Sequence, residues 1–384
     1  MDEDAGLDCG PESFVNRLGG RGRDVITHAI APAALSGRER AAEAPVRTLQ
    51  FGVIGYGYWG PHLVRNLDAM PNSAVRFVAD LDAGRLAQAA QAFSGPRLTF
   101  TKDAGELFAS DIDAVIVATP VKTHFALAKQ ALLAGKHVFV EKPLAVTVEE
   151  VEELVALARE RGLALMVGYT FLYHKAVQEL RRMLREDELG KLYYIDAQRL
   201  NLGLYRPDVN VVWDLAPHDL SMLRYLLDAD PVSVRADGAS HVAPGIEDIV
   251  YIHLRYGAPA GLVAHLQVSW LHPTKVRRFT LVGNRKMALY DDVDQDKIRI
   301  YDRGVDHPAH STTFEEFQLS YRNGAITIPT VPFTEPLRVA CEHFAQCIRT
   351  GETPLTDGAW SLPITRTLVA IGQSLKLGGQ EVEV

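Results

Sequence analysis

Five apolar segments of strand length alternate with helical segments early in the chain, and this alternation constrains the fold more than any other feature. The segments are residues 47–55, 74–80, 113–120, 136–143 and 163–168. Strands that are apolar along their whole length are typical of a sheet covered on both faces, and the intervening helices supply that cover. The pattern therefore predicts a doubly wound parallel sheet over residues 47–168.

The pattern changes after Tyr169. Helices are expected at about 175–188 and 218–227, and several of the later strands alternate apolar and polar residues, as antiparallel sheets do. Asn323-Gly324 predicts a hairpin turn, and residues 335–377 predict two further helices. A chain of 384 residues is long enough for two domains. We expect a flexible tail over 1–46, a first domain over 47–168 and a second over 169–384.

Charge and composition exclude several classes of function. A net charge of −8 gives no basic surface field for nucleic acid. The apolar runs are too short to cross a membrane, and the first 45 residues hold no signal-like apolar segment. The three cysteines form no CxxC pair, so no disulfide framework and no metal site is predicted. The expected location is the reducing cytoplasm.

The first strand runs into a turn with the glycine spacing GxGxxG, and a helix follows it. In this context Gly55 makes the tight turn, Gly57 lets a pyrophosphate approach the backbone, and Gly60 lets helix and strand pack closely. Asp80 follows Gly60 by 20 residues, where a carboxylate binds the ribose hydroxyls and repels a 2′-phosphate. We therefore predict NAD rather than NADP. Asp82 is a competing candidate, and Arg85 could soften the preference.

A second motif, Glu141-Lys142-Pro143, follows the fourth apolar strand, at the edge where ligands bind in parallel sheets. A lysine held there can donate or accept a proton beside a nicotinamide, provided that burial or a neighbouring cation lowers its pKa. Taken alone, a solvated surface lysine is the more common interpretation.

Asp214 and His218 lie four residues apart, so both side chains face one way on a helical turn. His218 is expected at the start of the helix. A carboxylate that orients an imidazole is an ordinary acid–base arrangement, although a capping or packing histidine fits this pattern equally well. The acid–base interpretation of this pair is favoured only in combination with the glycine turn and the Glu-Lys-Pro motif.

At this point the sequence resembles the Gfo/Idh/MocA family of oxidoreductases. The matching segments are GVIGYGYWG, ATPVKTHFALAKQALLAGKHVFVEKPLA, LMVGYTF, WDLAPHDLSML and HFAQCIRTGETPLTDG. The resemblance covers about 47–384. It implies an α/β fold with an N-terminal Rossmann domain and a C-terminal α/β domain built on a large, mostly antiparallel open sheet. It also implies hydride transfer between nicotinamide and a hydroxyl or ketone of a sugar-like substrate.

The resemblance assigns roles to individual residues. Lys142, Asp214 and His218 match the family's catalytic lysine, aspartate and histidine. Thr119, Pro120 and His124 match its nicotinamide-side loop. With the glycine turn, the predicted cofactor-binding set is Gly55, Tyr56, Gly57, Tyr58, Trp59, Gly60, Asp80, Thr119, Pro120, His124, Glu141 and Lys142. Where many members have a glycine-rich run before the aspartate, this chain has DVNVV, so the substrate-site backbone can run differently.

The stretch RLNLGLYRPDVNVVWDLAPHDLS is most similar to a subgroup of nucleotide-sugar enzymes that resemble UDP-N-acetylglucosamine 3-dehydrogenases. Residues just upstream of Asp214 could bind diphosphate or sugar hydroxyls, although a polar loop without ligand contact is an equal alternative. The predicted substrate-binding set is Lys142, Arg199, Asn201, Tyr205, Arg206, Asp214 and His218.

For oxidation we expect His218 or Lys142 to accept the hydroxyl proton as the hydride leaves, while Asp214 orients or balances the pair. The alternatives are a polyol or inositol dehydrogenase, a sugar ketoreductase, an NAD-dependent glycosidase-type enzyme, and a non-catalytic dinucleotide sensor. An open sheet with one uncovered face also predicts self-association, as a homodimer or a homotetramer.

Overall fold

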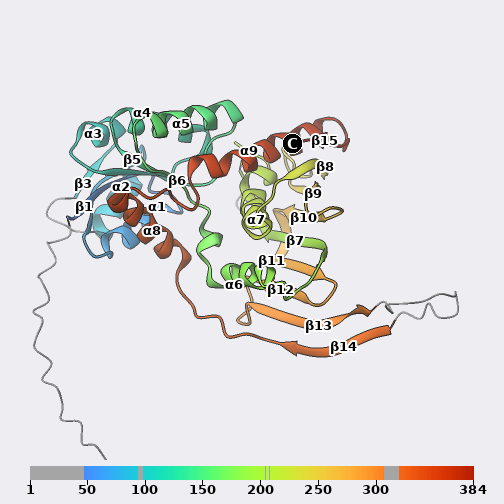
Figure 1. Ribbon diagram of the computed structural model, residues 1–384. Coiled ribbons are helices and arrows are strands. Elements are labelled where there is room, and N and C mark those ends of the chain that lie inside the picture. Colours follow the sequence, from blue (N-terminus) through green and yellow to red (C-terminus); the bar gives the residue numbers. More distant parts are fainter. Residues whose placement is uncertain (1–46, 94–97, 204, 207, 307–319) are drawn as a thin grey trace, which may run out of the picture. The chain divides into compact units, whose positions relative to one another are not determined.

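A computed structural model describes residues 47–384 with the exception of 94–97, 204, 207 and 307–319 (Figure 1). The expected tail over 1–46 lies outside the described residues. A six-stranded sheet comes first, with the strand order β3-β2-β1-β4-β5-β6 and parallel pairing throughout. Its strands are β1 (Leu49–Ile54), β2 (Ser73–Ala79), β3 (Thr99–Thr101), β4 (Ala114–Val117), β5 (His137–Val140) and β6 (Leu165–Val167). The predicted parallel Rossmann sheet is confirmed.

The helices of this part are α1 (Gly60–Asp68), α2 (Ala83–Ala92), α3 (Ala104–Ala109), α4 (His124–Leu133) and α5 (Val148–Glu160). Gly135 and Gly162 follow α4 and α5 with φ of +74° and +64°, the left-handed conformation in which many helices end. Strand β3 and helix α3 were not predicted from the sequence. Each is short, and α3 depends on the side chain of Asp103, which accepts the N–H of Gly105 as an N-cap.

The second sheet has nine strands in the order β14-β13-β12-β11-β7-β10-β9-β8-β15. Only the β7–β10 pair is parallel among the described pairs, which confirms a mostly antiparallel sheet. Its strands are β7 (Leu192–Leu202), β8 (Pro231–Ala239), β9 (Ile249–Tyr256), β10 (Val263–Ser269), β11 (Leu271–Gly283), β12 (Met287–Asp291), β13 (Ile298–Asp306), β14 (Ser320–Thr327) and β15 (Val382–Glu383).

Two helices of the second half accompany this sheet, α6 (Lys175–Arg185) and α7 (Val211–Leu227). The expectation that a helix starts at His218 is wrong, because α7 begins seven residues earlier and continues through Pro217. The cause is local, since the side chain of Asn210 caps the helix by accepting the N–H of Trp213. His218 therefore lies inside α7, one full turn after Asp214.

The predicted hairpin turn at Asn323-Gly324 is also wrong, because both residues lie within β14. Asn323 pairs with Arg303 of the antiparallel neighbour β13. A Cβ at Gly324 would come within 2.6 Å of the carbonyl oxygen of Asp302, so glycine here permits close approach of two strands. The connection between these strands falls in 307–319, outside the described residues.

The C-terminal helices α8 (Pro336–Thr350) and α9 (Gly358–Lys376) confirm the two helices expected there, and they join the two sheets (Figure 1). Phe344 of α8 packs against Phe51 and Phe139 of the first sheet, with ring centroids 6.4 and 5.8 Å apart. In α9 the hydroxyl of Ser374 accepts the N–H of Ala236 on β8 at 2.9 Å. The boundary at 168/169 stays a prediction, and α8 shows that the later segment also covers the first sheet.

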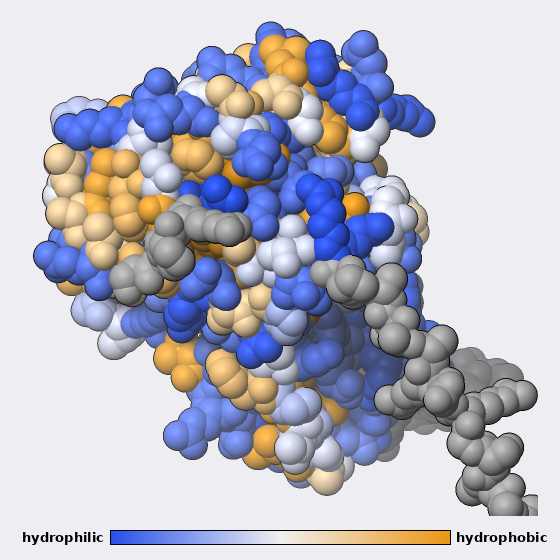
Figure 2. Space-filling model, turned by 90° about the vertical axis from the view of Figure 1, so that its left-hand side faces the viewer, coloured by the Kyte–Doolittle hydropathy of each residue, from blue (hydrophilic) through white to orange (hydrophobic). Residues whose placement is uncertain are grey.

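The face drawn in Figure 2 mixes hydrophilic and hydrophobic groups. Within the described residues no helix has the combined length and apolarity needed to cross a membrane. The core is continuous from the first sheet to the second, and Phe51, Phe139 and Trp270 are among its largest buried side chains.

Candidate active site

The glycine turn follows β1 at the point where the strand order of the first sheet reverses. Gly55 has a φ of +97°, and a Cβ there would lie 2.4 Å from the carbonyl oxygen of Ala118. A Cβ at Gly60 would lie 2.4 Å from the carbonyl oxygen of Gly55. At Gly57, by contrast, the nearest atom is Nη1 of Arg85, 3.7 Å away. The turn is therefore tightly packed at its two ends and open at its centre, as a pyrophosphate site requires.

The aromatic residues of this turn differ in exposure. Tyr56 is buried, and its backbone N–H donates to the carboxylate of Asp80 at 2.7 Å. Tyr58 and Trp59 are exposed, at 73% and 36%, and their rings meet edge to face with centroids 5.2 Å apart. The turn thus presents two exposed rings and a backbone whose position is tied to Asp80.

The structure distinguishes between Asp80 and Asp82. Asp80 accepts the N–H of Tyr56 on Oδ2 and the N–H of Asp82 on Oδ1, so its carboxylate is fixed beside the glycine turn. Asp82 is the N-cap of α2 and accepts the N–H groups of Gly84 and Arg85. Arg85 lies 3.5 Å from Asp80. Asp80 is therefore better placed to meet a ribose, and Arg85 stands next to it.

A chain of contacts joins the glycine turn to Lys142. A Cβ on Gly55 would approach Cγ2 of Thr119 to 3.0 Å, and Pro120 precedes the short 3-10 helix η1 (Val121–Thr123). The buried ring of His124 bridges two carbonyl oxygens, with Nε2 at 2.8 Å from Thr119 and Nδ1 at 2.8 Å from Pro143. His124 therefore lies between the loop after β4 and the loop after β5, and in its neutral form it can donate to only one of the two carbonyl oxygens at a time.

Glu141 and Lys142 follow β5, and both are largely buried, since Glu141 is 7% exposed and the side chain of Lys142 is 10% exposed. Burial raises the pKa of Glu141 to about 7, and its Oε1 has no hydrogen-bond partner among the described residues. Burial lowers the pKa of Lys142 from its usual range, although the charges of Asp214 and Glu141 oppose that shift. The Lys142–Pro143 peptide bond is cis. Two buried ionisable groups in sequence are typical of a site that handles protons.

Lys142 reaches across to α7. Its Nζ donates to the backbone carbonyl of Asp214 at 2.6 Å and lies 3.7 Å from the carboxylate Oδ1 of the same residue. Nη1 of Arg206 also lies 3.7 Å from that Oδ1, and the indole N–H of Trp270 donates to Oδ2 at 3.0 Å. Asp214 is thus the common neighbour of two cations and one indole.

His218 lies one turn after Asp214 on α7, as the spacing predicts. No hydrogen bond joins the two side chains within the described part of the chain, so of the two roles expected for Asp214, orienting the pair or balancing its charge, the first has no direct bond to His218 behind it. The His218 ring packs edge to face on Phe171, with centroids 5.2 Å apart, and its buried Nδ1 has no described partner. Burial, then the charges of Lys142, Arg199 and Arg277, hold the pKa of His218 well below its usual value. The ring is therefore neutral at neutral pH.

The four upstream residues predicted to bind substrate separate into two groups. Arg199 is 4% exposed, forms a bidentate ion pair with Asp219 at 2.8 and 2.9 Å, and has no described partner for its Nη1. Arg206 pairs with Asp208 near Asp214. The hydroxyl of Tyr205 is instead occupied by the turn at 243–246, since it bonds the backbone there.

Asn201, the last of the four, is partly buried near the end of β7, and a Cβ on Gly203 would meet its amide at 2.6 Å. The arginines thus lie near Asp214 and His218 with unused or shared hydrogen-bonding capacity. Tyr205 supports the local backbone, and its ring packs on Trp270 with centroids 5.1 Å apart.

Sequence reasoning missed several residues that contact this site. Trp270 and Phe171 lie in segments whose patterns indicate only packing. Asp219 directly follows His218 and accepts both hydrogen bonds of the buried Arg199. Arg277 lies opposite Arg199 across β11 and β7 and bonds Asp292 at 2.9 Å. Strand pairing is what brings these charges together, and pairing partners cannot be read from one strand.

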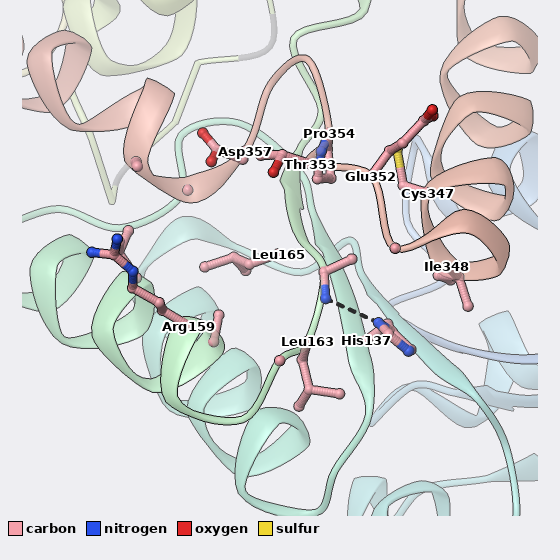
Figure 3. Close-up of a pocket in the computed structure, with 17 residues that line it drawn as sticks. His137, Arg159, Leu163, Leu165, Cys347, Ile348, Glu352, Thr353, Pro354 and Asp357 are labelled. Atoms are coloured by element: carbon pink, nitrogen blue, oxygen red, sulfur yellow. Dashed lines mark hydrogen bonds between the residues drawn. The ribbon is translucent and has the colours of Figure 1, made fainter.

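A pocket of about 570 Å³ lies elsewhere, between α5 and the α8–α9 connection (Figure 3). It meets the amino ends of β5 and β6, where Nδ1 of His137 accepts the N–H of Ala164 at 2.9 Å. Lys142 follows the carboxyl end of β5, so this pocket is separate from the candidate active site. No cluster of three or more potential metal ligands occurs among the described residues.

Comparisons with known proteins agree with this fold. A model described as an oxidoreductase family with an NAD-binding Rossmann fold matches residues 49–169, and the GFO/IDH/MocA C-terminal domain matches 177–289. The chain is 32% identical over 261 residues to UDP-N-acetylglucosamine 3-dehydrogenase of Acidithiobacillus ferrooxidans, across 67% of this chain and 78% of the relative. A solved structure of that enzyme gives a TM-score of 0.69 at 27% identity, covering 86% of this chain and 98% of that one.

A second relative acts on a different class of substrate. The chain is 25% identical over 320 residues to the scyllo-inositol 2-dehydrogenase (NAD(+)) of Bacillus subtilis, across 79% of this chain and 87% of the relative.

Proposed function

Because the chain belongs to the Gfo/Idh/MocA family of oxidoreductases, we propose that it transfers hydride between NAD and a carbinol of a sugar, specifically of a nucleotide sugar. Oxidation and reduction of CH–OH groups is the chemistry of this family and of its matched relatives. The observation that carries the proposal is the position of Lys142. Its buried ammonium bonds α7 beside Asp214 and is connected through Pro143, His124 and Thr119 to the glycine turn.

The residues present fit a dinucleotide. Gly57 leaves open space at the centre of the turn, and the N–H groups at the start of α1 favour the negative pyrophosphate. Asp80 would accept the ribose hydroxyls. Thr119 and Pro120 would line the nicotinamide side with Glu141, whose unpartnered Oε1 is available for a polar ligand atom. When bound, the nicotinamide would accept the hydride or return it.

The chain's own groups then handle the proton. Lys142 is the acid–base group in this proposal, because burial brings its pKa down towards the working range while Asp214 keeps the ammonium form accessible. In oxidation Lys142 Nζ accepts the hydroxyl proton, and in reduction it returns that proton to the oxygen. His218 stays neutral and offers a ring nitrogen as a hydrogen-bond partner for the substrate hydroxyl. Asp214 balances the charge that remains on Lys142.

Positive charge near the site supports an anionic substrate. Arg199 and Arg277 face each other on neighbouring strands, and Lys275 precedes them in an irregular part of β11. The charge of Arg277, then burial, lowers the pKa of Lys275, which has no ion pair among the described residues. Arg199 and Arg277 are paired with Asp219 and Asp292, so a diphosphate would find its cation in Lys275 and an unused donor in Nη1 of Arg199. The likeness to UDP-N-acetylglucosamine 3-dehydrogenase points to the same substrate class, whereas inositol is the candidate if charge proves unimportant.

The preference for NAD rests on Asp80. Its carboxylate is held by two backbone N–H groups beside the turn, where it would repel a 2′-phosphate. Arg85, 3.5 Å from Asp80, reduces that repulsion without removing it. We expect kcat/KM with NAD to exceed kcat/KM with NADP, and an equal or reversed ratio would overturn the assignment.

Self-association is proposed from the face of the second sheet on which Tyr194, Tyr251 and Val263 lie, each more than 40% exposed. A dimer or tetramer would cover these residues. Light scattering coupled to size-exclusion chromatography measures the mass directly. A monomer at all concentrations would contradict the proposal.

The central experiment combines a substrate screen with one variant. UDP-, GDP- and dTDP-sugars and free polyols are incubated with NAD, and reduced nicotinamide is followed by absorbance. Lys142→Ala should abolish turnover of any substrate found and leave NADH binding intact, because Lys142 handles the proton and other residues hold the dinucleotide. Lys129, a surface residue paired with Glu153, provides the matched control as Lys129→Ala. Near-wild-type turnover by Lys142→Ala would refute the proposed chemistry.

A further inference from the structure

The two carboxylate oxygens of Asp214 have different surroundings. Oδ2 accepts the indole N–H of Trp270 at 3.0 Å. Oδ1 faces Lys142 Nζ and Arg206 Nη1, each at 3.7 Å. That separation allows Coulomb attraction but exceeds a hydrogen bond. The ammonium of Lys142 instead bonds the backbone carbonyl of Asp214, at 2.6 Å. The carboxylate therefore stands near the lysine without closing on it.

Trp270 is rigidly held. It lies between β10 and β11 and is 2% exposed. Its backbone N–H donates to Asp248 at 2.9 Å, its carbonyl accepts the N–H of Gly203 at 3.2 Å, and its ring packs on Tyr205. An indole N–H can only donate, so it selects an acceptor and cannot change roles. A fixed donor of this kind restrains one oxygen of Asp214 and thereby the orientation of the whole carboxylate.

We propose that Trp270 is a positioning residue for the reaction, which holds the Asp214 carboxylate in a 3.7 Å ion pair with Lys142 and prevents it from closing to hydrogen-bond distance. The inference rests on the proposed role of Lys142 in proton transfer. A carboxylate free to rotate would be drawn towards two cations and would hold the lysine in its ammonium form. Restrained by Trp270, it balances the charge and leaves the lysine proton available to substrate.

The test measures the pKa of Lys142 itself, so it requires no knowledge of the natural substrate. Competitive acetylation with acetic anhydride, read by mass spectrometry of the peptide that contains Lys142, gives this pKa from the pH dependence of labelling. In Trp270→Phe, which keeps most of the ring and removes the N–H, the pKa of Lys142 should rise by about one unit. Trp360→Phe is the matched control. Its ring packs on Tyr169 and Arg224, and it should leave the Lys142 pKa unchanged.

A double-variant cycle tests whether Trp270 acts through Asp214. In the background of Asp214→Asn the charge is gone, so adding Trp270→Phe should not move the Lys142 pKa further. If Trp270→Phe fails to fold, replacement of all four tryptophans by β-(3-benzothienyl)alanine keeps the ring shape and substitutes sulfur for the N–H. The same rise is expected there.

Two results would overturn the inference. One is an unchanged Lys142 pKa in a folded protein without the Trp270 N–H. The other is an equal shift in the presence and absence of the Asp214 charge. Either result would leave the proposed function standing, whereas active Lys142→Ala would refute that function. If a substrate is turned over, the kcat–pH profile of Trp270→Phe should show the Lys142 ionisation at the same raised pKa as the acetylation experiment. The KM for NAD should stay constant.

Discussion

Gly57 and Gly60 belong to one motif, yet the structure gives them separate roles, cofactor access for Gly57 and close packing for Gly60. Alanine substitutions should distinguish these roles. A Cβ at Gly60 would lie 2.4 Å from the carbonyl oxygen of Gly55 and 3.1 Å from its carbon, so the backbone must move. Overpacking of this kind costs about 1–3 kcal/mol of folding free energy. A Cβ at Gly57 would meet only the flexible end of Arg85 at 3.7 Å. Gly57→Ala should therefore change the folding free energy by no more than about 0.5 kcal/mol.

The effect on NADH should be the reverse. A methyl group at Gly57 would occupy the space through which the pyrophosphate approaches the backbone N–H groups. Hydrogen bonds to charged groups contribute about 1.5–3 kcal/mol each, so loss of one or two weakens binding by about 3 kcal/mol, or roughly 100-fold in Kd. Gly60→Ala should lose stability first, and its NADH affinity should fall only as far as the turn is displaced.

The two quantities are measured independently. Urea unfolding gives the folding free energy, and fluorescence titration gives the Kd for NADH. Gly372→Ala is the matched control, because nothing lies within 4 Å of a Cβ at this position in α9. Wild-type NADH affinity in a stable Gly57→Ala variant would refute the placement of the pyrophosphate. Unchanged stability in Gly60→Ala would refute the packing argument.

Two further substitutions test buried charges. Asp219→Asn should destabilise the protein by about 3–5 kcal/mol in urea unfolding, because it leaves the buried guanidinium of Arg199 without its counter-charge; a loss under about 1 kcal/mol would contradict this. Burial raises the pKa of Glu141 from 4.5 to about 7, so the folded chain retains a proton that the unfolded chain releases between those values. Stability should therefore fall by roughly 3 kcal/mol as pH rises through that window, relative to Glu141→Gln, and a pH-independent difference would contradict it.

Periodicity predicted the first sheet well because its long strands are mostly apolar and each carries its own signal. It failed where structure depends on a single side chain. Asp103 caps α3, and Asn210 starts α7 before the segment that looked helical. Asn323-Gly324 has the composition of a turn, yet its glycine serves strand contact instead. Where a helix starts, or whether a segment forms a turn or a strand, depends here on individual side-chain and strand contacts. The periodicity of the sequence does not contain these contacts.

The candidate site was predictable where the chemistry is carried by a short motif. Lys142 lies beside Asp214, and His218 lies one turn after Asp214 on α7, whereas their roles stay predictions. The partner of Asp214 was not predictable, because Trp270 is brought to it by the pairing of distant strands. Tyr205 looked like a ligand contact and instead bonds the backbone of a neighbouring turn. Polar residues near a motif therefore indicate the region of the binding site. Which of them can still bind a ligand depends on the hydrogen bonds that they form with neighbouring segments.

The position of α8 has a consequence for how the protein is made. Phe344 fills the space against Phe51 and Phe139, so the Rossmann core is completed by a residue synthesised some 200 positions after Phe139. On the ribosome, where domains generally fold as units from the N-terminus, the first sheet emerges with this apolar surface uncovered. Chaperones that bind exposed aromatic patches have their longest opportunity to bind the first sheet during that interval. Deletions after residue 335 should also weaken dinucleotide binding, although they remove no residue of the glycine turn.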